Sequence, residues 1–570
     1  MKRYKALASF LVAGAALLLA ASSCNIDPVF YSQVVPSTFY TNQDAVWQRF
    51  DRPFTHWRWY LASNNPRWEL QELGTDEICL PTRGSDWYNG AVFQNFHHHH
   101  YTTDMEAIND GWKGFGMGVA LAWSAWEDLQ QVDLASLGFD ESTLSSMEGQ
   151  LKTLIASFYL DGLDFFGGVP LYNSTSDPVK GRSTALETFN YVDSILQANI
   201  ANLPVKTELG APETNIVHQA VAAGLLARLY FNAETYIGTP MYDKAAAICQ
   251  DIIDGKYGKY ALDPDWTDIF GFNNETSPEI MWTVPSQNAK AETDGEYWDQ
   301  WMPYNIRNYL GGLQSTGGNN GYCLQPSLDP DGKPYTFKLS GPYRKFSDQD
   351  IRKQIYTYKG GGKYEGMFFA GRLVNPVDTS WYCVGAREYK GEILTLIDQV
   401  AYLAPDRVGT SDYKKSDIAH GEENSGIRLL KRSPRPTQAD HSLMFNPDIP
   451  VMRLAEFYYT LAECKMRSGD FQGAADLINT VRKRYFPNGD PNAVTAASLQ
   501  GTDGKYRMLD EWMQEFIGEA RRRTDLIRWN AYVTESWWDH QATNDANLRH
   551  FPIHYSVMSA NPLLEQNPGY

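Results

Sequence analysis

The sequence lacks three features: a second long apolar run, paired cysteines and an excess of positive charge. After the apolar segment near residues 6–21, no run approaches the ~20 apolar residues of a membrane-spanning helix. The 6 cysteines are scattered and form no C-x-x-C, so neither a disulfide framework nor a zinc site follows. The formal net charge of -18 argues against nucleic acid as a partner and against anionic lipid beyond an anchor.

Motifs of catalysis and metal binding are also missing. The chain has no Walker loop and no G-x-S-x-G, although its 68 Asp and Glu residues guarantee carboxylate pairs by chance and leave a two-carboxylate glycosidase open. Adjacent histidines in His97–His100 point to alternate faces of an extended segment, so a scaffold loop is favoured over a metal site. Asp329–Gly332 begins like a calcium loop, but position twelve would be Ser340 rather than Glu. We predict no catalytic residue, no metal and no cofactor; a structural calcium ion stays open but is not predicted.

The first 23 residues have the pattern of a secretory signal. Lys2, Arg3 and Lys5 form a basic start, an apolar core follows from Ala6 to Ala21, and small residues run directly into Cys24. This order resembles a bacterial lipoprotein signal, with Cys24 as the lipidated first residue of the mature chain. Several acyl chains would anchor the protein firmly at a membrane surface, because each buried CH₂ contributes ~0.8 kcal/mol. The alternative is an ordinary signal peptide with an incidental cysteine.

Helical periodicity marks two parts of the chain, residues 24–254 and residues 449–570. Within Pro450–Phe486 apolar residues recur at helical spacing on two segments, and Gly469-Asp470 breaks them, which predicts a helical hairpin of tetratricopeptide type. The same mutual spacings occur earlier in the chain, with Ala233, Tyr242, Ala245, Ile248 and Ile252 matching Ala462, Phe471, Ala474, Leu477 and Val481. A repeat of this kind indicates a scaffold rather than a function.

The intervening residues 255–448 have a different character. Gly, Pro, Asn and aromatic residues dominate there, and an insertion of this length predicts short strands and small helices. The fold class is therefore mostly α: helical hairpins, about four in number, with a large irregular insertion. Aromatic residues make up 14% of the chain; many should belong to the core, but several cluster in segments rich in Gly, Asn and Pro, where no helix core is available. Flat rings stack on the C–H face of a sugar while polar neighbours bond its hydroxyls, so these segments favour carbohydrate binding.

Three aromatic clusters are candidate glycan sites. The loop 73–104 supplies Asp76, Arg83, Asp86, Trp87, Tyr88 and Asn89; the insertion supplies Trp298, Trp301, Tyr304 and Tyr309, and then Trp381, Tyr382 and Arg387. The first cluster has an alternative interpretation, in which Trp87 packs into the helical scaffold and Arg83 forms an ion pair with Asp86. The second cluster also has one, because its spacings of three to five residues fit a single helical face that packs inward.

Four motifs carry a resemblance to a known family. They are RLAEFYYTLAEC at 453–464, NTVRKR at 479–484, EFIGEARRRTDLIRW at 515–529 and NPLLEQNPGY at 561–570. In this order they resemble the SusD/RagB family of outer-membrane glycan-binding lipoproteins from Bacteroidetes, and the resemblance covers nearly the whole mature chain. It implies four tetratricopeptide-like hairpins with the irregular segments packed on one side as the glycan-binding face. It also places ligand aromatics in a loop comparable to the one that carries Trp87.

The resemblance further implies a function without a chemical step. A cell-surface lipoprotein, anchored in the outer membrane through Cys24 and facing the cell exterior, would capture an oligosaccharide and deliver it to a TonB-dependent transporter of the SusC type. The alternatives are a surface glycoside hydrolase, or a peptide-binding or assembly lipoprotein of the same importer type. The sequence does not name the glycan.

Overall fold

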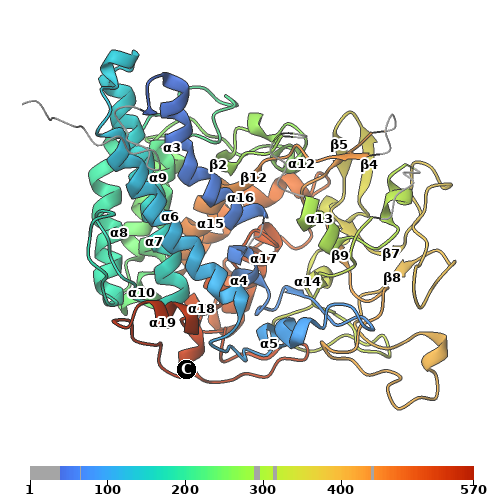
Figure 1. Cartoon of the computed structure of the whole chain (residues 1–570). Helices are drawn as coiled ribbons and strands as arrows, with labels where there is room; N and C mark the ends of the chain where they lie inside the picture. Colours follow the sequence, from blue (N-terminus) through green and yellow to red (C-terminus); the bar gives the residue numbers. More distant parts are fainter. Residues whose placement is uncertain (1–38, 64–65, 288–289, 291–294, 312–316, 438–441) are drawn as a thin grey trace, which may run out of the picture.

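The computed structural model describes residues 39–570, except residues 64–65, 288–289, 291–294, 312–316 and 438–441. The predicted signal segment and Cys24 lie outside the described residues. Long helices stand side by side at one end of the molecule, and a loop-rich region of short strands forms the other end (Figure 1). Within the described part of the chain, no helix combines the length and apolar character that crossing a membrane requires.

The long helices form a layer in which each packs against the next. Along the layer α6 packs on α3 and α7, α7 on α8, α9 on α11, α11 on α15, and α15 on α16. The bounds are α3 Gln43–Arg58, α6 Glu106–Leu129, α7 Glu141–Phe166, α8 Ala185–Asn199, α9 Gln219–Phe231, α11 Tyr242–Ile253, α15 Ala455–Arg467 and α16 Phe471–Arg482. Neighbouring helices joined by short turns are the unit of a tetratricopeptide-like array, so the mostly helical hairpin fold is confirmed.

The described residues form further helices, of which α17 is as long as α3 and the others are short. They are α4 Pro66–Glu72, α5 Val92–His97, α10 Ala233–Ile237, α12 Trp266–Phe270, α13 Gly295–Trp301, α14 Pro342–Lys345, α17 Gly501–Phe516, α18 Arg522–Arg528 and α19 Tyr555–Ala560. A π-helical turn at Trp59–Ser63 leads from α3 toward α4. The motif at residues 515–529 is divided between α17 and α18, because Gly518 (φ 74°) and Ala520 (φ 59°) adopt left-handed backbone conformations between them.

The two matching segments of the sequence form two hairpins that lie against each other. Gly469 takes a φ of 90° between α15 and α16, and the Asp470 side chain caps α16 by accepting the backbone N–H of Gly473 at 2.9 Å. The helix predicted from Pro450 onward starts too early. Residues Ile449–Arg453 form strand β12, which pairs antiparallel with β2 (Ile280–Val284), and α15 begins only at Ala455. Val451 therefore lies on a strand, where pairing with a distant segment overrides the local helical spacing.

Helices α6 and α7 approach closely because α6 carries glycines on its inner face. A Cβ atom at Gly118 would lie 2.3 Å from the Phe158 ring of α7, which real side chains do not tolerate. A Cβ at Gly116, on the same helix, would meet nothing nearer than the Trp112 Nε1 at 4.0 Å. The two glycines thus differ in packing although they share one helix.

Replacing Gly118 with alanine should destabilise the protein by about 1–3 kcal/mol, because the added methyl overpacks the α6–α7 contact. Gly116→Ala is the matched control and should stabilise by roughly 0.5–1 kcal/mol, since alanine favours the helix. Urea unfolding of both variants measures the free energies. Equal effects at the two positions would refute the close-packing role of Gly118.

The strands of the described residues form two-stranded antiparallel sheets, consistent with the short strands expected for the insertion. The pairs are β1 (Ile78–Cys79) with β3 (Cys323–Leu324), β2 with β12, β4 (Thr357–Gly360) with β5 (Lys363–Glu365), β6 (Phe368–Phe369) with β9 (Arg428–Leu429), β7 (Gly371–Arg372) with β8 (Thr395–Leu396), and β10 (Arg435–Thr437) with β11 (Ser442–Met444). Much of the backbone between them bonds to buried side chains instead. Glu423, for example, accepts the backbone N–H groups of Ala386, Arg387 and Tyr389 at 2.7–3.1 Å.

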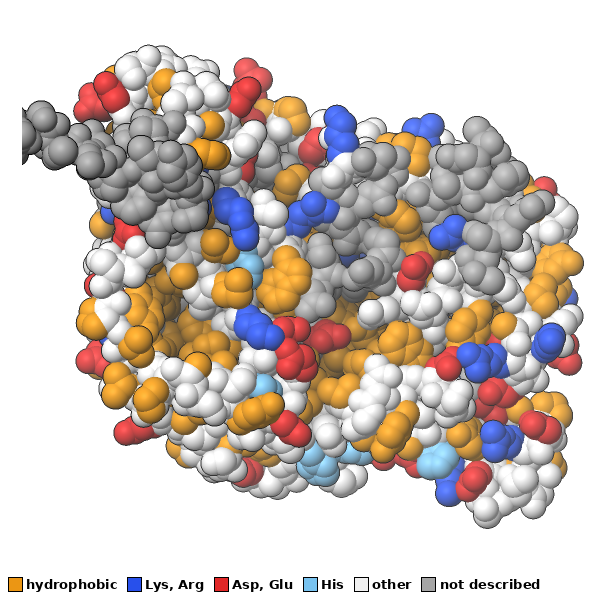
Figure 2. All heavy atoms as spheres, in the orientation of Figure 1, with side chains coloured by type: hydrophobic (Ala, Val, Ile, Leu, Met, Phe, Trp, Pro, Cys, Tyr) orange, Lys and Arg blue, Asp and Glu red, His pale blue; other side chains and the backbone are white. Residues whose placement is uncertain are grey.

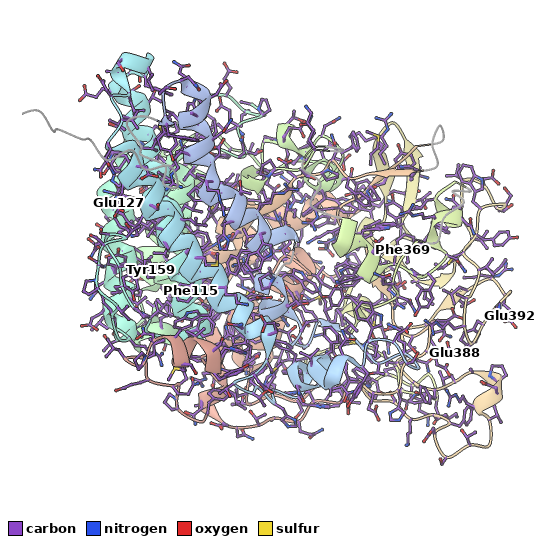
Figure 3. The ribbon with its side chains drawn as sticks, in the orientation of Figure 1. Phe115, Glu127, Tyr159, Phe369, Glu388 and Glu392 are labelled. Atoms are coloured by element: carbon purple, nitrogen blue, oxygen red, sulfur yellow. The ribbon has the colours of Figure 1, made fainter. Side chains whose placement is uncertain are left out.

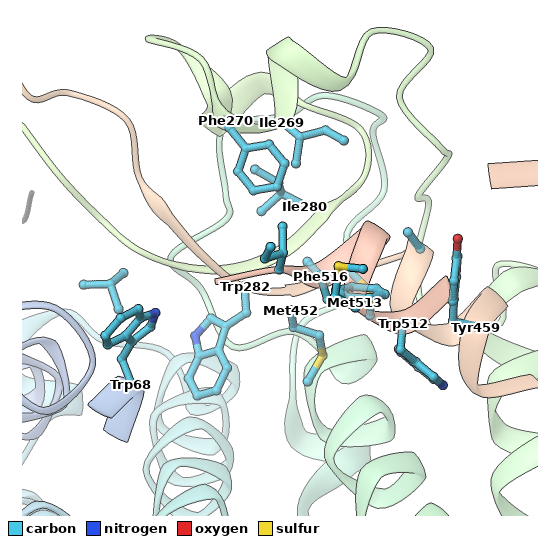
Figure 4. Packing of buried hydrophobic residues seen from close by; sticks show 14 of the residues in the cluster. Trp68, Ile269, Phe270, Ile280, Trp282, Met452, Tyr459, Trp512, Met513 and Phe516 are labelled. Carbon is cyan, nitrogen blue, oxygen red and sulfur yellow. The ribbon is translucent and has the colours of Figure 1, made fainter. Parts of the chain in front are cut away.

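Aromatic side chains join the helical layer to the β2–β12 pair. Trp282 of β2 stacks on Trp57 of α3 with ring centroids 4.2 Å apart. Figure 4 shows Trp282 and Met452 projecting from the paired strands toward the helices, with Trp512 and Phe516 of α17 beside them. The core is therefore continuous from the helices into the loop-rich region.

A buried ion network lies at the end of β12. The Arg453 guanidinium donates to Glu279 at 3.0 Å, to Glu515 at 2.7 Å and to Glu519 at 2.8 Å, and all four side chains are at most 12% exposed. Arg484 adds a 2.8 Å pair with Glu515. Burial opposes ionisation of Glu515, but the charges of the surrounding arginines outweigh it and lower the pKa of this carboxyl to about 2. The network is thus charged at neutral pH, and Arg453 is its centre.

Candidate functional site

The loop that carries Trp87 is held in an unusual backbone conformation. Arg83 and Asp86 exchange two backbone hydrogen bonds of 3.0 Å across a tight turn. Trp87 (φ 63°), Asn89 (φ 41°) and Ala91 (φ 66°) then all adopt left-handed conformations, which side chains other than glycine rarely take. Strain of this kind persists where surrounding contacts fix it and gathers at ligand sites, so the loop is a candidate binding element.

The Trp87 ring is fixed by contacts on two sides while remaining partly exposed. Its Nε1 donates to the carbonyl oxygen of Asn319 at 2.9 Å, and its ring meets Phe93 edge to face with centroids 6.1 Å apart. Gly321 allows this approach, because a Cβ atom there would lie 3.1 Å from the indole. The neighbouring Tyr88 side chain is 56% exposed. Two aromatic side chains that follow each other in the sequence thus reach solvent on this loop.

The structure brings residues of all three sequence clusters together at Asp86. The Asp86 carboxylate accepts a short hydrogen bond from the Tyr304 hydroxyl and one of 2.5 Å from the Arg387 guanidinium, which also lies 5.0 Å from the centre of the Tyr304 ring. Burial, and then the hydrogen bond to Asp86, raise the pKa of Tyr304 to about 12, so its phenol stays protonated and donates. Asp86 is 29% exposed and Arg387 is 42% exposed. The trio therefore offers a carboxylate, a guanidinium and a phenol to solvent at one place.

Five of the predicted site residues lie in the interior and offer no surface to a ligand in this structure. They are Asp76, Arg83, Trp298, Trp301 and Tyr309, each at most 2% exposed. Each has a structural partner instead. The inward-facing helical alternative therefore describes three members of the second cluster.

The two polar members of the buried set owe their burial to partners far away in the sequence. Asp76 accepts two bonds from Arg522, at 2.7 and 2.8 Å. The Arg83 guanidinium donates to the backbone carbonyl oxygens of Glu422, Ser425 and Gly321 at 2.5–3.1 Å. Arg83 and Asp86 do contact each other, but through their backbones rather than as the ion pair considered from the sequence.

The remaining predicted residues are accessible. Asn89 is exposed at the edge of the Trp87 loop. Tyr382 is 38% exposed, and Trp381 is partly exposed on the turn that the backbone bond from Trp381 to Asp378 closes. Glu388, the neighbour of Arg387, lies in the loop-rich end, away from Phe115, Glu127 and Tyr159 on helices α6 and α7 (Figure 3). The accessible candidates thus belong to the irregular region and not to the helical layer.

A cavity of about 530 Å³ opens beside the Trp87 loop, and sequence reasoning missed it. Its lining mixes aromatic and aliphatic side chains with four carboxylates; Figure 2 shows acidic side chains beside a hollow near the middle of this face. The lining includes Asn89, Val92, Phe93, Phe96, Met105, Gln300, Tyr322, Glu69, Asp104, Glu106 and Asp110. The carboxylates come from α4 and α6 and the segment just before α6, where helical spacing gives no sign that they converge.

Glu69 is the most perturbed of these carboxylates. Burial raises its pKa to about 7, against the opposing hydrogen bond that it accepts from the Tyr322 hydroxyl at 3.1 Å. A carboxyl near this pKa both donates and accepts hydrogen bonds at neutral pH. The cavity therefore combines apolar side chains with a larger polar surface that includes acceptors, which suits a polyhydroxylated ligand with apolar faces.

The histidine run packs into the scaffold next to this region. His97 bonds through one ring nitrogen to the Trp538 carbonyl oxygen (3.0 Å) and through the other to Gln325 (3.3 Å). His97, His98 and Asp539 bring potential metal-ligand atoms within 4.8 Å of one another, and Asp539 is a carboxylate partner that the sequence did not reveal. Because both nitrogens of His97 are already hydrogen-bonded, the arrangement favours the scaffold role.

Buried neutral histidines predict a loss of stability in acid. His540 is fully buried, and burial lowers its pKa to about 4. Unfolding frees this side chain to bind a proton near its ordinary pKa of ~6.5, so the unfolded state gains protons first as the pH falls. The free energy of unfolding should therefore decrease between pH 6.5 and 4, by roughly 3 kcal/mol from His540 alone. Urea unfolding at several pH values measures this dependence.

The control for this prediction is His540→Gln, which cannot titrate but can still donate to the His97 carbonyl oxygen that His540 contacts at 2.7 Å. Its stability should fall less steeply between pH 6.5 and 4 than that of the unaltered protein. Parallel curves for the two proteins would contradict the assignment.

Comparison with known proteins adds to this geometry. The model of the SusD family, named for SusD and RagB, matches residues 278–570, more than half of the chain. The starch-binding protein SusD of Bacteroides thetaiotaomicron is 23% identical over 456 residues, covering 76% of this chain and 74% of that relative.

Solved structures share the fold. Surface glycan-binding protein A from Bacteroides thetaiotaomicron superposes with a TM-score of 0.63 at 16% identity, over 93% of this chain and 100% of that one. A laminarin-binding SusD-like protein gives a TM-score of 0.59 at 18% identity, again over 93% and 100% of the two chains. Together with the family match, these comparisons confirm the resemblance that the four motifs indicated. The chain belongs to the SusD family.

Proposed function

We propose that this protein binds oligosaccharides or polysaccharides at the cell surface and passes them to a SusC-like TonB-dependent transporter. The observation that carries the proposal is that Trp87 and Tyr88 directly follow Asp86, whose carboxylate holds Tyr304 and Arg387, on the loop that also lines the 530 Å³ cavity. The rings supply flat apolar surfaces and the trio supplies donors and acceptors for hydroxyl groups. Membership of the SusD family, and relatives whose names state starch and glycan binding, support the same function.

The binding residues in this proposal are those that solvent reaches. Trp87 and Tyr88 stack on sugar rings, Asp86 and Arg387 bond hydroxyl groups, and Tyr304 orients Asp86. Asn89 extends the site toward the cavity. Trp381 and Tyr382 form an outer part of the same face. No chemical step is assigned, because the proposed site uses stacking and hydrogen bonds only.

The location follows from the first residues of the chain. The basic start, the apolar core and Cys24 support a lipid anchor in the outer membrane, with the folded part facing the cell exterior. The helical layer, at the end of the molecule opposite the loop-rich region, is the proposed frame for the transporter. This division leaves the ligand face free for capture.

A screen of purified protein against a panel of polysaccharides and oligosaccharides tests the proposal. We expect retention by at least one glycan, with a dissociation constant of roughly micromolar or weaker, because sites of this kind are shallow and wet. Each glycan is recovered afterwards and sized. Shortened products would favour the hydrolase alternative, while the absence of binding together with co-purification of a large β-barrel would favour the assembly alternative.

A further inference from the structure

Two cysteines that are far apart in the sequence face each other beneath the Trp87 loop. Cys79 of β1 stands directly opposite Cys323 of β3 in an antiparallel register, and their sulfur atoms lie 3.6 Å apart. Directly opposite residues of antiparallel strands have Cα atoms roughly 4.5–5.5 Å apart, which lies inside the range of disulfide-bonded cysteines. We propose that Cys79 and Cys323 form a disulfide that covalently joins β1 to β3.

The surroundings suit a bridge at this position. Both side chains are buried, and they pack with Val400, Ile418 and Trp538 in one small apolar cluster. Gly426 passes over Cys323 so closely that a Cβ atom there would lie 2.4 Å from the sulfur. The backbone therefore packs closely around Cys323. Formation of the bond requires the two sulfur atoms to move closer together, but it requires no change in the register of β1 and β3.

The bond forms by thiol–disulfide exchange with a disulfide-bearing oxidant. One cysteine thiolate attacks a sulfur of the donor and releases a donor thiolate, which leaves a mixed disulfide. The second cysteine thiolate attacks the protein sulfur of this intermediate and releases the other donor thiolate. The two cysteines lose two protons and two electrons, and the donor takes up both as two thiols. Because both sulfurs are buried in the finished fold, the exchange precedes closure of β1 on β3.

The bridge would fix both sides of the Trp87 loop. That loop begins shortly after Cys79, and Asn319 and Gly321, which contact Trp87 and Arg83, stand just before Cys323. The sulfurs would join segments 244 positions apart in the sequence. A cross-link at this point ties the first aromatic cluster to the insertion, independently of whether glycan is the ligand.

Peptide mapping of the full-length chain, exported through its own signal and purified without reductant, tests the bridge directly. The protein is denatured, its free thiols are blocked with N-ethylmaleimide, and it is digested without reduction. We expect a peptide pair joined through Cys79 and Cys323, two hydrogens lighter than the separate peptides, while Cys249, Cys383 and Cys464 carry the blocking group. Blocked Cys79 and Cys323 in the unreduced sample would overturn the proposal.

Thermal unfolding supplies a second readout. Reductant should lower the Tm of the unaltered protein and of a Cys383→Ala control, which removes a buried cysteine elsewhere in the insertion. It should leave the Tm of a Cys79→Ala/Cys323→Ala variant unchanged. An equal Tm shift in all three proteins, or none in any, would also overturn the proposal. If the double variant fails to fold, the peptide map of the unaltered chain still decides.

Discussion

Replacing Trp87 with alanine is expected to weaken binding of the cognate glycan by roughly 30-fold or more. A tryptophan at the centre of a binding site contributes about 2 kcal/mol or more on truncation, and ~1.4 kcal/mol corresponds to a tenfold change in affinity. The effect should fall mainly on binding, because Trp87 is partly exposed and its structural contacts are the hydrogen bond to the Asn319 carbonyl oxygen and packing at the edge of the core, including Phe93. Affinity electrophoresis or calorimetry with the glycan found in the screen measures the loss.

Two further variants separate stacking from other effects of Trp87. Trp87→Phe keeps a ring but loses the bond to Asn319, so its affinity should lie between those of the unaltered protein and the alanine variant. Tyr555→Ala removes a ring that is 58% exposed on α19 and should leave binding unchanged. Unchanged glycan retention by the alanine variant, with an unaltered circular dichroism spectrum, would remove Trp87 from the site.

Replacing Arg453 with methionine is expected to destabilise the protein by about 3–5 kcal/mol, because it removes the positive charge that three buried carboxylates share. Among the described residues, Glu279, Glu515 and Glu519 would keep their ion pairs with Arg484, Arg352 and Lys431 but share one positive charge fewer, while methionine fills much of the vacated volume. Because a loss of this size is a large fraction of the free energy of unfolding of a domain, we also expect a lower yield of folded protein. Urea unfolding and the yield of soluble protein give the measurement.

An exposed ion pair provides the control for Arg453. Lys338 and Asp503 pair at 3.1 Å with side chains 62% and 84% exposed, so Lys338→Met should change the free energy of unfolding by less than about 1 kcal/mol. Arg453→Lys retains the charge but loses the planar set of donors. Its free energy of unfolding should lie between those of the Arg453→Met and Lys338→Met variants. An Arg453→Met variant as stable as Lys338→Met would show that the network does not stabilise the fold.

The sequence predicted the helical layer well because periodicity is a local property. Gly469 and Asp470 placed the turn between α15 and α16, and the apolar spacing placed both helices. The same reasoning failed at Val451, because the strand β12 that contains it pairs with β2, which lies in another part of the chain. A pattern that is read along one segment contains no information about which distant segment will pair with it.

The candidate site was predictable only in part, for the same reason. Trp87, Asp86 and Arg387 were identified by residue type in irregular segments, but only the structure brings the latter two together. Asp76 had equally suitable chemistry, and its burial depends on Arg522, 446 positions away. Residue type thus identifies groups able to bind a sugar, and long-range packing decides which of them solvent reaches.

Glu423 holds a neighbouring loop through its side chain, and this mode of attachment affects how the loops of such a family can change in length and sequence. In an extended sheet, one inserted residue shifts the register of a strand and turns its side chains to the opposite face. In this protein a carboxylate gathers the N–H groups of Ala386, Arg387 and Tyr389, and the sheets of the described residues pair only two strands each. A loop bound in this way can lengthen or shorten without moving its neighbours. The proposed ligand face is therefore modular, and new sugar preferences would arise loop by loop on an unchanged helical frame.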